Sequence, residues 1–212
     1  MSPKSSSANI PRHQISSKDS VEKRIAASLR ETARLHTALP PAQIRLMAQV
    51  AHAMTEAITK GHKIIWCGNG GSATQSQHMA AEFVGRFQRE RRSLPSISLT
   101  ENMASVTAIG NDYSFEHIFS RQLEGLAQEG DVVVGLSTSG HSKNVLQALR
   151  TARALGLTTI GFTGGSGSAL STLCDICLRV PSTTTARIQE VHLAIGHILC
   201  ALVEDALEPP SS

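Results

Sequence analysis

The stretch "IIWCGNGGSATQSQHMAAEFVGRF", residues 64–87, begins with an apolar run, passes through a glycine-rich loop and continues with a helical pattern. Strand, loop and helix in this order form the opening unit of an α/β fold with a parallel sheet. Gly68, Gly70 and Ala73 satisfy the G-x-G-x-x-A pattern of dinucleotide-binding folds. His78 and Glu82 follow, one helical turn apart, at positions where a dinucleotide-binding site has no functional residues. The stretch predicts a binding loop and leaves its ligand open between a dinucleotide and a sugar phosphate.

The rest of the chain weakens the dinucleotide interpretation. Such a site needs an acidic residue about 20 positions further on, at the end of the second strand, to bind the ribose hydroxyls. The nearest candidate, Glu101, comes roughly 30 residues later and past the end of that strand. No G-x-x-x-x-G-K-[ST] motif is present, so a P-loop nucleoside triphosphatase is not indicated.

From residue 63 onward, strand and helix patterns alternate along the chain. We expect strands at 63–67, 95–99, 131–136, 158–163 and 175–180, and helices at 73–90, 116–128, 142–155 and 185–207. The run "VVVGL" at 132–136 is apolar on both sides, which is typical of a parallel strand covered by helices on both faces. The pattern predicts a doubly wound α/β sheet that binds its ligands beyond the carboxyl ends of the strands.

The N-terminal third adds helices to this core. Residues 20–39 and 40–61 have helical periodicity, and we expect these helices to cover the sheet and to pair with other copies of the chain. Residues 1–19 are rich in Ser, Lys and Pro and lack the apolar segment of a secretory signal, so we expect a disordered leader. A chain of 212 residues suits one α/β domain, which we place at 20–208.

Composition narrows the partners and the compartment. Only 3% of the residues are aromatic and the net charge is +3, which argues against binding of nucleic acid. The chain contains no run of about 20 apolar residues, so we expect no membrane-spanning helix and a cytoplasmic protein. Cys174 and Cys177 form a C-x-x-C, but the alternation of Cys174, Ile176 and Leu178 favours packing on one face of a strand over a redox or zinc site.

Two loops have the residues of an anion site. The first is 68–72 and the second is "STSGHS", residues 137–142, directly after "VVVGL". Backbone N–H groups at a helix start attract an anion, and the hydroxyls of these loops add donors without bulk. An ordinary polar helix cap is the alternative, because Ser and Thr are common there.

Ionisable residues on two helices suggest chemistry beside these loops. His78 and Glu82 share one helix face, where they could bind a divalent metal or transfer protons, or form an exposed polar pair without function. The last helix, "ARIQEVHLAIGHILCALVEDAL" at 186–207, is largely apolar yet contains Gln189, Glu190, His192 and His197. Burying the imidazole of His197 among apolar neighbours without a partner is energetically unfavourable, which suggests a functional role. The alternative is a core histidine that has a hydrogen-bond partner.

The chain resembles the sugar isomerase (SIS) domain family, and within it the sedoheptulose 7-phosphate isomerases, or phosphoheptose isomerases. The resemblance spans about residues 20–207 and depends on the joint match of four stretches: "GNGGSATQSQHMAAEFVGRF" (68–87), "TAIGNDYSFEHIFSRQ" (107–122), "GDVVVGLSTSGHSKNV" (130–145) and "ARIQEVHLAIGHI" (186–198). It implies an SIS-domain three-layer sandwich with a five-stranded parallel sheet, a homotetramer and active sites at the subunit interfaces.

The resemblance also implies roles for individual residues. Glu82 and His197 would be the catalytic pair, and Arg86 would lie close to the site. In zinc-containing members the ligands of one ion per subunit correspond to His78, Glu82, Gln189 and His197. The residues expected to contact the phosphate or the sugar are Asn69, Gly70, Gly71, Ser72, Asn111, Asp112, Ser137, Thr138, Ser139, Ser142 and Gln189.

The implied reaction converts D-sedoheptulose 7-phosphate to D-glycero-D-manno-heptose 7-phosphate through an enediol, as the first step of ADP-heptose supply for the lipopolysaccharide core. This reaction moves one proton between C1 and C2 and another between the two oxygens, which requires acid–base groups. Glu82 would be the base at carbon and His197 the partner at oxygen. Gln189 and His197 are eight residues apart, about 12 Å along a helix. The sequence therefore leaves open whether the ligands of one ion come from one subunit or from two.

Two departures and two alternatives qualify the resemblance. Ala186 stands where some members have an acidic residue, and the leader is longer than is usual in the family.

One alternative is a non-catalytic SIS tetramer that binds the bacterial replication initiator; such proteins lack the helical histidine, whereas His197 is present here. The other is an SIS enzyme for a phosphorylated amino sugar, which "GNDYSF" (110–115) and the helix with Gln189 and His197 disfavour.

Overall fold

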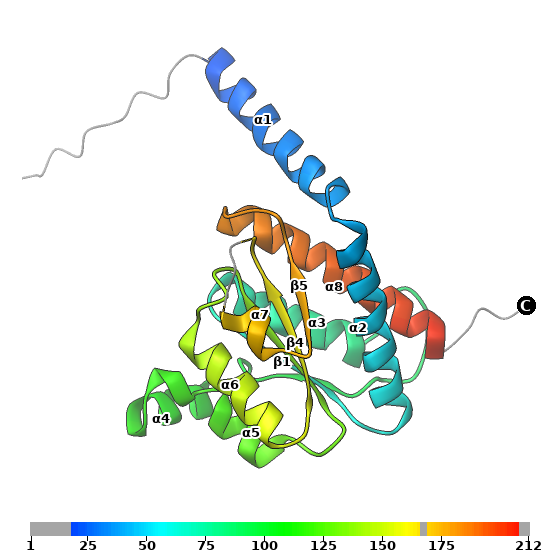
Figure 1. The fold of residues 1–212 in the computed structure, drawn as a ribbon, viewed down its shortest axis with the longest axis vertical. Helices are drawn as coiled ribbons and strands as arrows, with labels where there is room; N and C mark the ends of the chain where they lie inside the picture. The colour runs from blue at the N-terminus through cyan, green and yellow to red at the C-terminus, as the bar shows by residue number, and fades with distance from the viewer. Residues whose placement is uncertain (1–17, 166–168, 208–212) are drawn as a thin grey trace, which may run out of the picture.

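A five-stranded parallel sheet forms the centre of the computed structural model, which describes residues 18–165 and 169–207 (Figure 1). Every neighbouring pair of strands is parallel, in the order β2-β1-β3-β4-β5. The strands are β1 (Ile64–Gly68), β2 (Ser96–Ser98), β3 (Val132–Ser137), β4 (Thr158–Thr163) and β5 (Ile176–Arg179). All five lie where the apolar runs predict them, each within one residue at either end.

Helices cover both faces of this sheet. They are α1 (Lys18–Thr37), α2 (Pro41–Thr59), α3 (Gly71–Val84), α4 (Met103–Asp112), α5 (Ser120–Leu126), α6 (Lys143–Ala154), α7 (Ala169–Leu173) and α8 (Thr185–Leu207), with a 3₁₀ turn η1 (Phe115–His117). The leader expected at 1–19 lies outside the described residues apart from 18 and 19, which already belong to α1.

Alternate side chains of each strand enter two separate cores. Trp66 and Val134 pack with α2, α3 and α8, whereas Ile65 and Val133 pack with α5 and α6. Successive strand residues point to opposite faces, so a strand that is apolar throughout needs helices on both sides. The prediction of a three-layer α/β sandwich is confirmed.

Two predicted helices are wrong in extent. The helix expected at 73–90 ends at Val84, because Gly85 leaves the helical path and the amides beyond it bond to the Glu204 carboxylate on α8. The helix expected at 116–128 is η1 followed by the shorter α5. The sequence patterns also missed α4, which buries no residue, and the five-residue α7.

The N-terminal helix α1 projects from the body of the molecule, whereas α2 lies along the sheet (Figure 1). Two side-chain hydrogen bonds join α1 to α8: Thr32 Oγ1 donates to Glu190 Oε2 (2.8 Å), and Arg187 donates to the carbonyl oxygen of Ser28 (3.0 Å). Ile25 and Leu29 on α1 are 55% and 66% exposed. Across the described part of the chain, no helix is long and apolar enough to cross a membrane.

The two cysteines of the C-x-x-C pack against the core cluster formed with α6, which confirms the packing interpretation. Burial raises the pKa of the Cys177 thiol to about 11 and also raises the pKa of Cys174, so both thiols stay protonated at neutral pH. The expected alternation is wrong at Cys174. It precedes β5 and lies on the side of Cys177, whereas Ile176 and Leu178 face the other core.

Candidate active site

The two predicted anion loops meet at the point where the order of the sheet reverses. From β1 the chain runs outward to β2 and then returns to β3 on the other side of β1. Both loops leave the carboxyl ends of these neighbouring strands, which is where open α/β sheets bind ligands. The Asn69 and Asn144 side chains join the loops through two reciprocal amide hydrogen bonds of 2.8 Å each.

The hydroxyl of Ser137 organises the second loop. Ser137 is 3% exposed, and its Oγ donates to Ser142 Oγ (2.9 Å) and accepts from the backbone N–H of Gly140 (3.1 Å). Gly140 has φ +68°, a left-handed conformation that favours glycine. The Ser139 hydroxyl accepts from the N–H of His141 (3.2 Å), and Thr138 is half-buried beside them. The predicted serines therefore gather at the start of α6.

Two cavities open beside the loops. One, of about 470 Å³, is bounded by Asn69, Ser142 and three residues that follow α4. The other, of about 210 Å³, reaches from Gly68 and Gly70 toward α4. Lining residues that the sequence analysis did not single out are Ser114, Phe115, Glu116, Lys143 and Asn144. The sequence could have indicated three of them, because Ser114, Phe115 and Glu116 come within four residues of Asp112, an expected sugar contact.

Helices α3 and α8 pack side by side and run in the same direction. Gln189, near the start of α8, lies at Ser72, on the first turn of α3. Further along, a Cβ on Gly196 would lie 2.2 Å from the sulfur of Met79. The absence of a side chain at Gly196 therefore lets the helices approach closely where His78 and His197 face each other.

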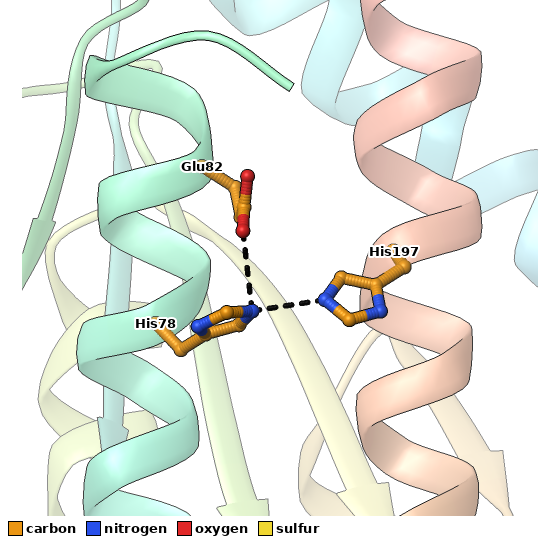
Figure 2. A group of neighbouring side chains, drawn as sticks. All are labelled: His78, Glu82 and His197. Carbon is orange, nitrogen blue, oxygen red and sulfur yellow. Dashed lines mark hydrogen bonds and ion pairs between the residues drawn. The ribbon is translucent and has the colours of Figure 1, made fainter. Parts of the chain in front are cut away.

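Three ionisable side chains converge between these helices (Figure 2). His78 Nε2 lies 2.9 Å from His197 Nε2 and 3.2 Å from Glu82 Oε1. The side chains of His78 and Glu82 are 46% and 21% exposed, so the group is open to solvent from one side in the single chain. The i,i+4 spacing on α3 predicts the first pair, and the structure brings His197 to it.

The donor atoms of this group suit a divalent metal. One ligand atom from each of His78, Glu82 and His197 lies within 4.8 Å of the other two. A single proton on His78 Nε2 can serve only one of its two partners well, whereas a cation at the common point would satisfy all three ligand atoms. Two imidazoles and one carboxylate with open access form the donor set of many catalytic zinc sites.

The fourth expected ligand stands apart from this group. The Gln189 amide Nε2 lies 3.4 Å from Ser72 Oγ, and a Cβ on Gly71 would come within 2.7 Å of the same nitrogen. Ser72 and His78 are six residues apart on α3, about 9 Å along its axis. Within one chain, Gln189 therefore belongs to the glycine-rich loop rather than to the cluster of His78 and His197.

Three further expected residues are not brought to the cluster within one chain. Asn111 donates to Asp112 Oδ1 (2.8 Å), and both are exposed at the end of α4. Asp112 lines a different groove, which includes Tyr113. Arg86 lies past the end of α3, where it is exposed and 3.9 Å from the Glu90 carboxylate.

Comparison with known proteins assigns the family. A model of the SIS domain matches residues 29–164. Phosphoheptose isomerase from Rhodospirillum rubrum is 52% identical over 161 residues, which cover 76% of this chain and 86% of that protein. The enzyme of that name from Nitratiruptor sp. is 56% identical over 151 residues, which cover 71% of this chain and 81% of the relative. The chain belongs to the phosphoheptose isomerase family.

Solved phosphoheptose isomerases share the whole architecture. The structure from Neisseria gonorrhoeae is similar with a TM-score of 0.82 and 37% identity, over 87% of this chain and 99% of that one. The structure from Francisella tularensis has a TM-score of 0.79 and 39% identity, over 88% and 97% of the two chains. The SIS domain match ends before α8, so it is independent of His197. The sequence relatives and the solved structures thus agree on the phosphoheptose isomerase family.

Proposed function

We propose that the protein is an aldose–ketose isomerase that interconverts D-sedoheptulose 7-phosphate and D-glycero-D-manno-heptose 7-phosphate. The observation that carries this proposal is the convergence of Glu82 and His197 on His78 in a chain 52% identical to a phosphoheptose isomerase. A carboxylate and an imidazole side by side are the two groups that an enediol mechanism requires.

In the proposed mechanism, Glu82 removes the proton from the carbon next to the carbonyl and returns it to the neighbouring carbon. His197 moves the second proton between the two oxygens, so that the enediol collapses to the other sugar. His78, 3.2 Å from Glu82 Oε1, orients the carboxylate from one helical turn away. Positioned acid–base groups of this kind typically accelerate proton transfer by about 10²–10⁴-fold each.

The phosphate end of the substrate is proposed to bind at the two switch-point loops. Gly70 before α3 and Lys143 at the start of α6 line the cavities there, and Ser72, Ser139 and Ser142 would supply hydroxyls. Helix N-termini attract anions because their N–H groups lack partners within the helix. Asn69 and the backbone of Gly70 and Gly71 would form the adjoining wall.

A zinc ion, one per subunit, is proposed at the cluster. His78, Glu82 and His197 would hold it. Gln189 lies apart from them within one chain and is proposed as a fourth ligand contributed by a neighbouring subunit. Bound there, zinc would supply a Lewis acid that polarises the carbonyl and stabilises the enediolate. The proton transfers themselves are assigned to side chains of this chain.

Assembly as a homotetramer with active sites between subunits is part of the proposal. Ile25, Leu29, Ile198 and Leu202 are between 43% and 66% exposed in the single chain, and exposed apolar groups of this kind mark association surfaces. Neighbouring subunits would also bring Asn111 and Asp112 to a catalytic cluster, which one chain does not do by itself.

The proposed setting is cytoplasmic carbohydrate metabolism, since the substrate is a phosphorylated sugar. As the first step of ADP-heptose synthesis, the product would serve the lipopolysaccharide core.

The decisive experiment incubates the purified protein with sedoheptulose 7-phosphate and follows the aldose by NMR. We expect product to form, and Glu82→Gln to abolish it. Absence of turnover both with and without added zinc, together with tight binding of the bacterial replication initiator, would replace the enzyme proposal by the non-catalytic alternative.

A further inference from the structure

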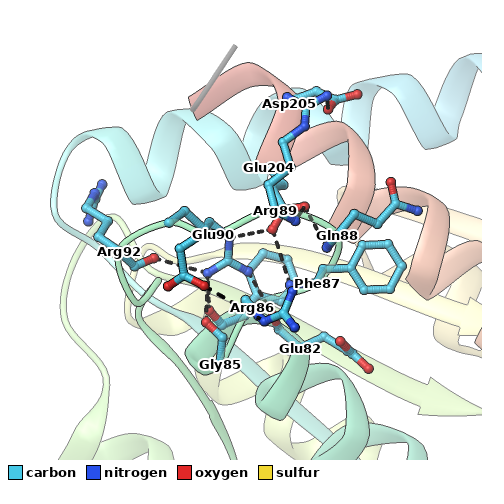
Figure 3. Close-up of polar contacts among 12 residues, drawn as sticks. Glu82, Gly85, Arg86, Phe87, Gln88, Arg89, Glu90, Arg92, Glu204 and Asp205 are labelled. Atoms are coloured by element: carbon cyan, nitrogen blue, oxygen red, sulfur yellow. Dashed lines mark hydrogen bonds and ion pairs between the residues drawn. The ribbon is translucent and has the colours of Figure 1, made fainter. Parts of the chain in front are cut away.

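A buried ion pair holds the segment that follows α3 against the end of α8 (Figure 3). The Glu204 carboxylate accepts hydrogen bonds from the backbone N–H of Phe87 (3.2 Å), Gln88 (2.8 Å) and Arg89 (3.1 Å). It also accepts from Arg91 Nε at 2.8 Å. The side chains of Arg91 and Glu204 are 2% and 1% exposed, so this pair lies in the interior although the segment runs over the surface.

The same arginine completes the end of α3. Its terminal nitrogens donate to the carbonyl oxygens of Glu82 (2.8 Å), Phe83 (2.9 Å) and Gly85 (3.1 Å). The last carbonyls of a helix lack partners within it and carry partial negative charge, so a guanidinium there satisfies both needs. One of these carbonyls belongs to Glu82, the proposed base.

The anchored segment places an aromatic ring on the other member of the catalytic pair. The ring of Phe87 stacks on the imidazole of His197, with centroids 5.6 Å apart and planes 22° apart. His78 meets the same imidazole edge-on, with centroids 5.1 Å apart and an angle of 68°. Phe87 thus covers one face of the imidazole while His197 Nε2 points at His78.

Rotamer preference alone does not fix such a ring. The χ2 torsion of histidine joins sp³ and sp² atoms, and its energy profile is broad and roughly two-fold. The plane of His197 is therefore set by its neighbours, and the stacked ring is the neighbour that restricts rotation. Small errors in the placement of a catalytic group are costly, since a displacement of about 1 Å can lower a rate about 10²-fold.

We propose that Phe87 is a positioning residue for His197, held in place by the buried pair of Arg91 and Glu204. The segment links the two halves of the site, because it is hydrogen-bonded to the backbone of Glu82 and stacked on His197. This inference rests on the proposed function for its kinetic consequences, but the orientation of His197 can be tested without turnover.

The test compares three variants of the full chain. Phe87→Leu removes the ring and keeps an apolar side chain, and Phe87→Tyr restores the ring. Phe162→Leu is the matched control, because Phe162 is a buried phenylalanine that packs edge-on against a different histidine, His192, at 5.5 Å. Two quantities are measured: kcat and KM with sedoheptulose 7-phosphate, and the rate at which diethylpyrocarbonate modifies His197 in chelator-treated protein, followed by peptide mass spectrometry.

We expect Phe87→Leu to lower kcat about ten- to a hundredfold, the range seen when a supporting residue of a catalytic group is lost, with KM little changed. The modification rate of His197 should rise, and Phe87→Tyr should restore both values. Phe162→Leu should lower the melting temperature and leave the kcat and the His197 rate close to wild type.

Two results would overturn the proposal: a wild-type kcat and modification rate in Phe87→Leu, or parallel changes in Phe87→Leu and Phe162→Leu. If the wild-type protein does not convert the sugar phosphate, the proposed function fails. The modification rates then still decide whether Phe87 orients His197.

Discussion

His78 and His197 face each other with their Nε2 atoms 2.9 Å apart, although 119 positions separate them in the chain. The contact exists because α3 and α8 pack in parallel, with Gly196 leaving room for Met79 between them. Glu82 joins the pair from the next turn of α3, at 3.2 Å from His78. The properties expected of the site follow from this meeting of two helices.

Removal of either proton-transfer group should abolish isomerisation and leave the protein assembled. Glu82→Gln keeps the shape of the side chain but cannot accept a proton, and His197→Ala removes the imidazole. We expect kcat to fall by about 10²–10⁴-fold in each variant. NMR of the sugar products gives the rate, and size-exclusion chromatography checks the assembly. Activity close to wild type in either variant would contradict the assigned roles.

A metal at the cluster predicts sensitivity to chelators. Treatment with EDTA should lower activity, and added zinc should restore it, because His78, Glu82 and His197 present three converging ligand atoms. His78→Ala should weaken zinc binding about ten- to a hundredfold or more in a competition assay with a chromogenic chelator. His52→Ala, at an exposed histidine on α2, is the control and should bind zinc like the wild type. Equal zinc affinity in the two variants would remove the metal from the proposal.

The second loop should depend on one buried hydroxyl. Ser137→Ala breaks the hydrogen bond to Ser142 and removes one of the two acceptors of the Gly140 N–H, which keeps its bond to the Ser137 carbonyl oxygen (3.0 Å). We expect the free energy of unfolding to fall by about 0.5–1.5 kcal/mol, the net value of a lost hydrogen bond, and KM for the sugar phosphate to rise. Thr172→Ala, which removes an exposed hydroxyl bonded only within α7 in the described contacts, should change neither value. Urea unfolding and initial-rate kinetics measure the two effects, and an unchanged KM in Ser137→Ala would contradict the phosphate assignment.

Gly71 should be required for the position of Gln189 rather than for the fold. A Cβ at Gly71 would lie 2.7 Å from Gln189 Nε2, at the flexible end of that side chain, so the amide would be displaced at little structural cost. Gly71→Ala should lower kcat about tenfold or more, because a shift of about 1 Å at a catalytic site is expensive. Gly125→Ala, where a Cβ meets nothing within 4 Å, is the matched control. If the two variants have the same kcat, Gln189 is not part of the site.

The buried pair of Arg91 and Glu204 predicts a pH-dependent contribution to stability. Burial by itself raises the pKa of Glu204, but hydrogen bonds from Gln88, Phe87, Arg91 and Arg89 outweigh it, so the folded pKa lies below the ordinary value. A carboxyl whose folded pKa is lowered stabilises the fold above its unfolded pKa, about 4.3, and loses this contribution as the pH falls through the folded value.

Glu204→Gln should therefore lower the melting temperature at pH 7, since it leaves the Arg91 charge buried without its counter-ion, a loss of about 3–5 kcal/mol when such a pair is broken. The difference from wild type should shrink as the pH is lowered below about 4. Asp205→Asn is the neighbouring control, because Asp205 is 52% exposed and its ion pair with Arg89 is at the surface. A difference that is constant from pH 7 to pH 3 would contradict the assignment.

Local patterns were sufficient for the strands and for part of the site. The run "VVVGL" is apolar on both sides and is followed by serine, and every β-strand lies within one residue of its predicted bounds at either end. The i,i+4 spacing of His78 and Glu82 needs only a regular helix to bring the two side chains together. By contrast, α4 is only ten residues long and buries no residue fully, with Val106 and Ile109 only partly buried against the core, so its periodicity is a weak signal.

The sequence by itself determined the α/β class, the two hydroxyl-rich loops and the pairing of His78 with Glu82, because these depend on neighbours within one or two turns. Only the tertiary structure decided that α3 ends at Val84, since a single glycine such as Gly85 is also tolerated inside a helix and the carboxylate that binds the segment beyond it, Glu204, comes more than a hundred residues later. It also decided that His197 meets His78 while Gln189 stays at Gly71. These contacts depend on the direction and register in which two helices pack, and that register is set by side chains distant from each other in the chain.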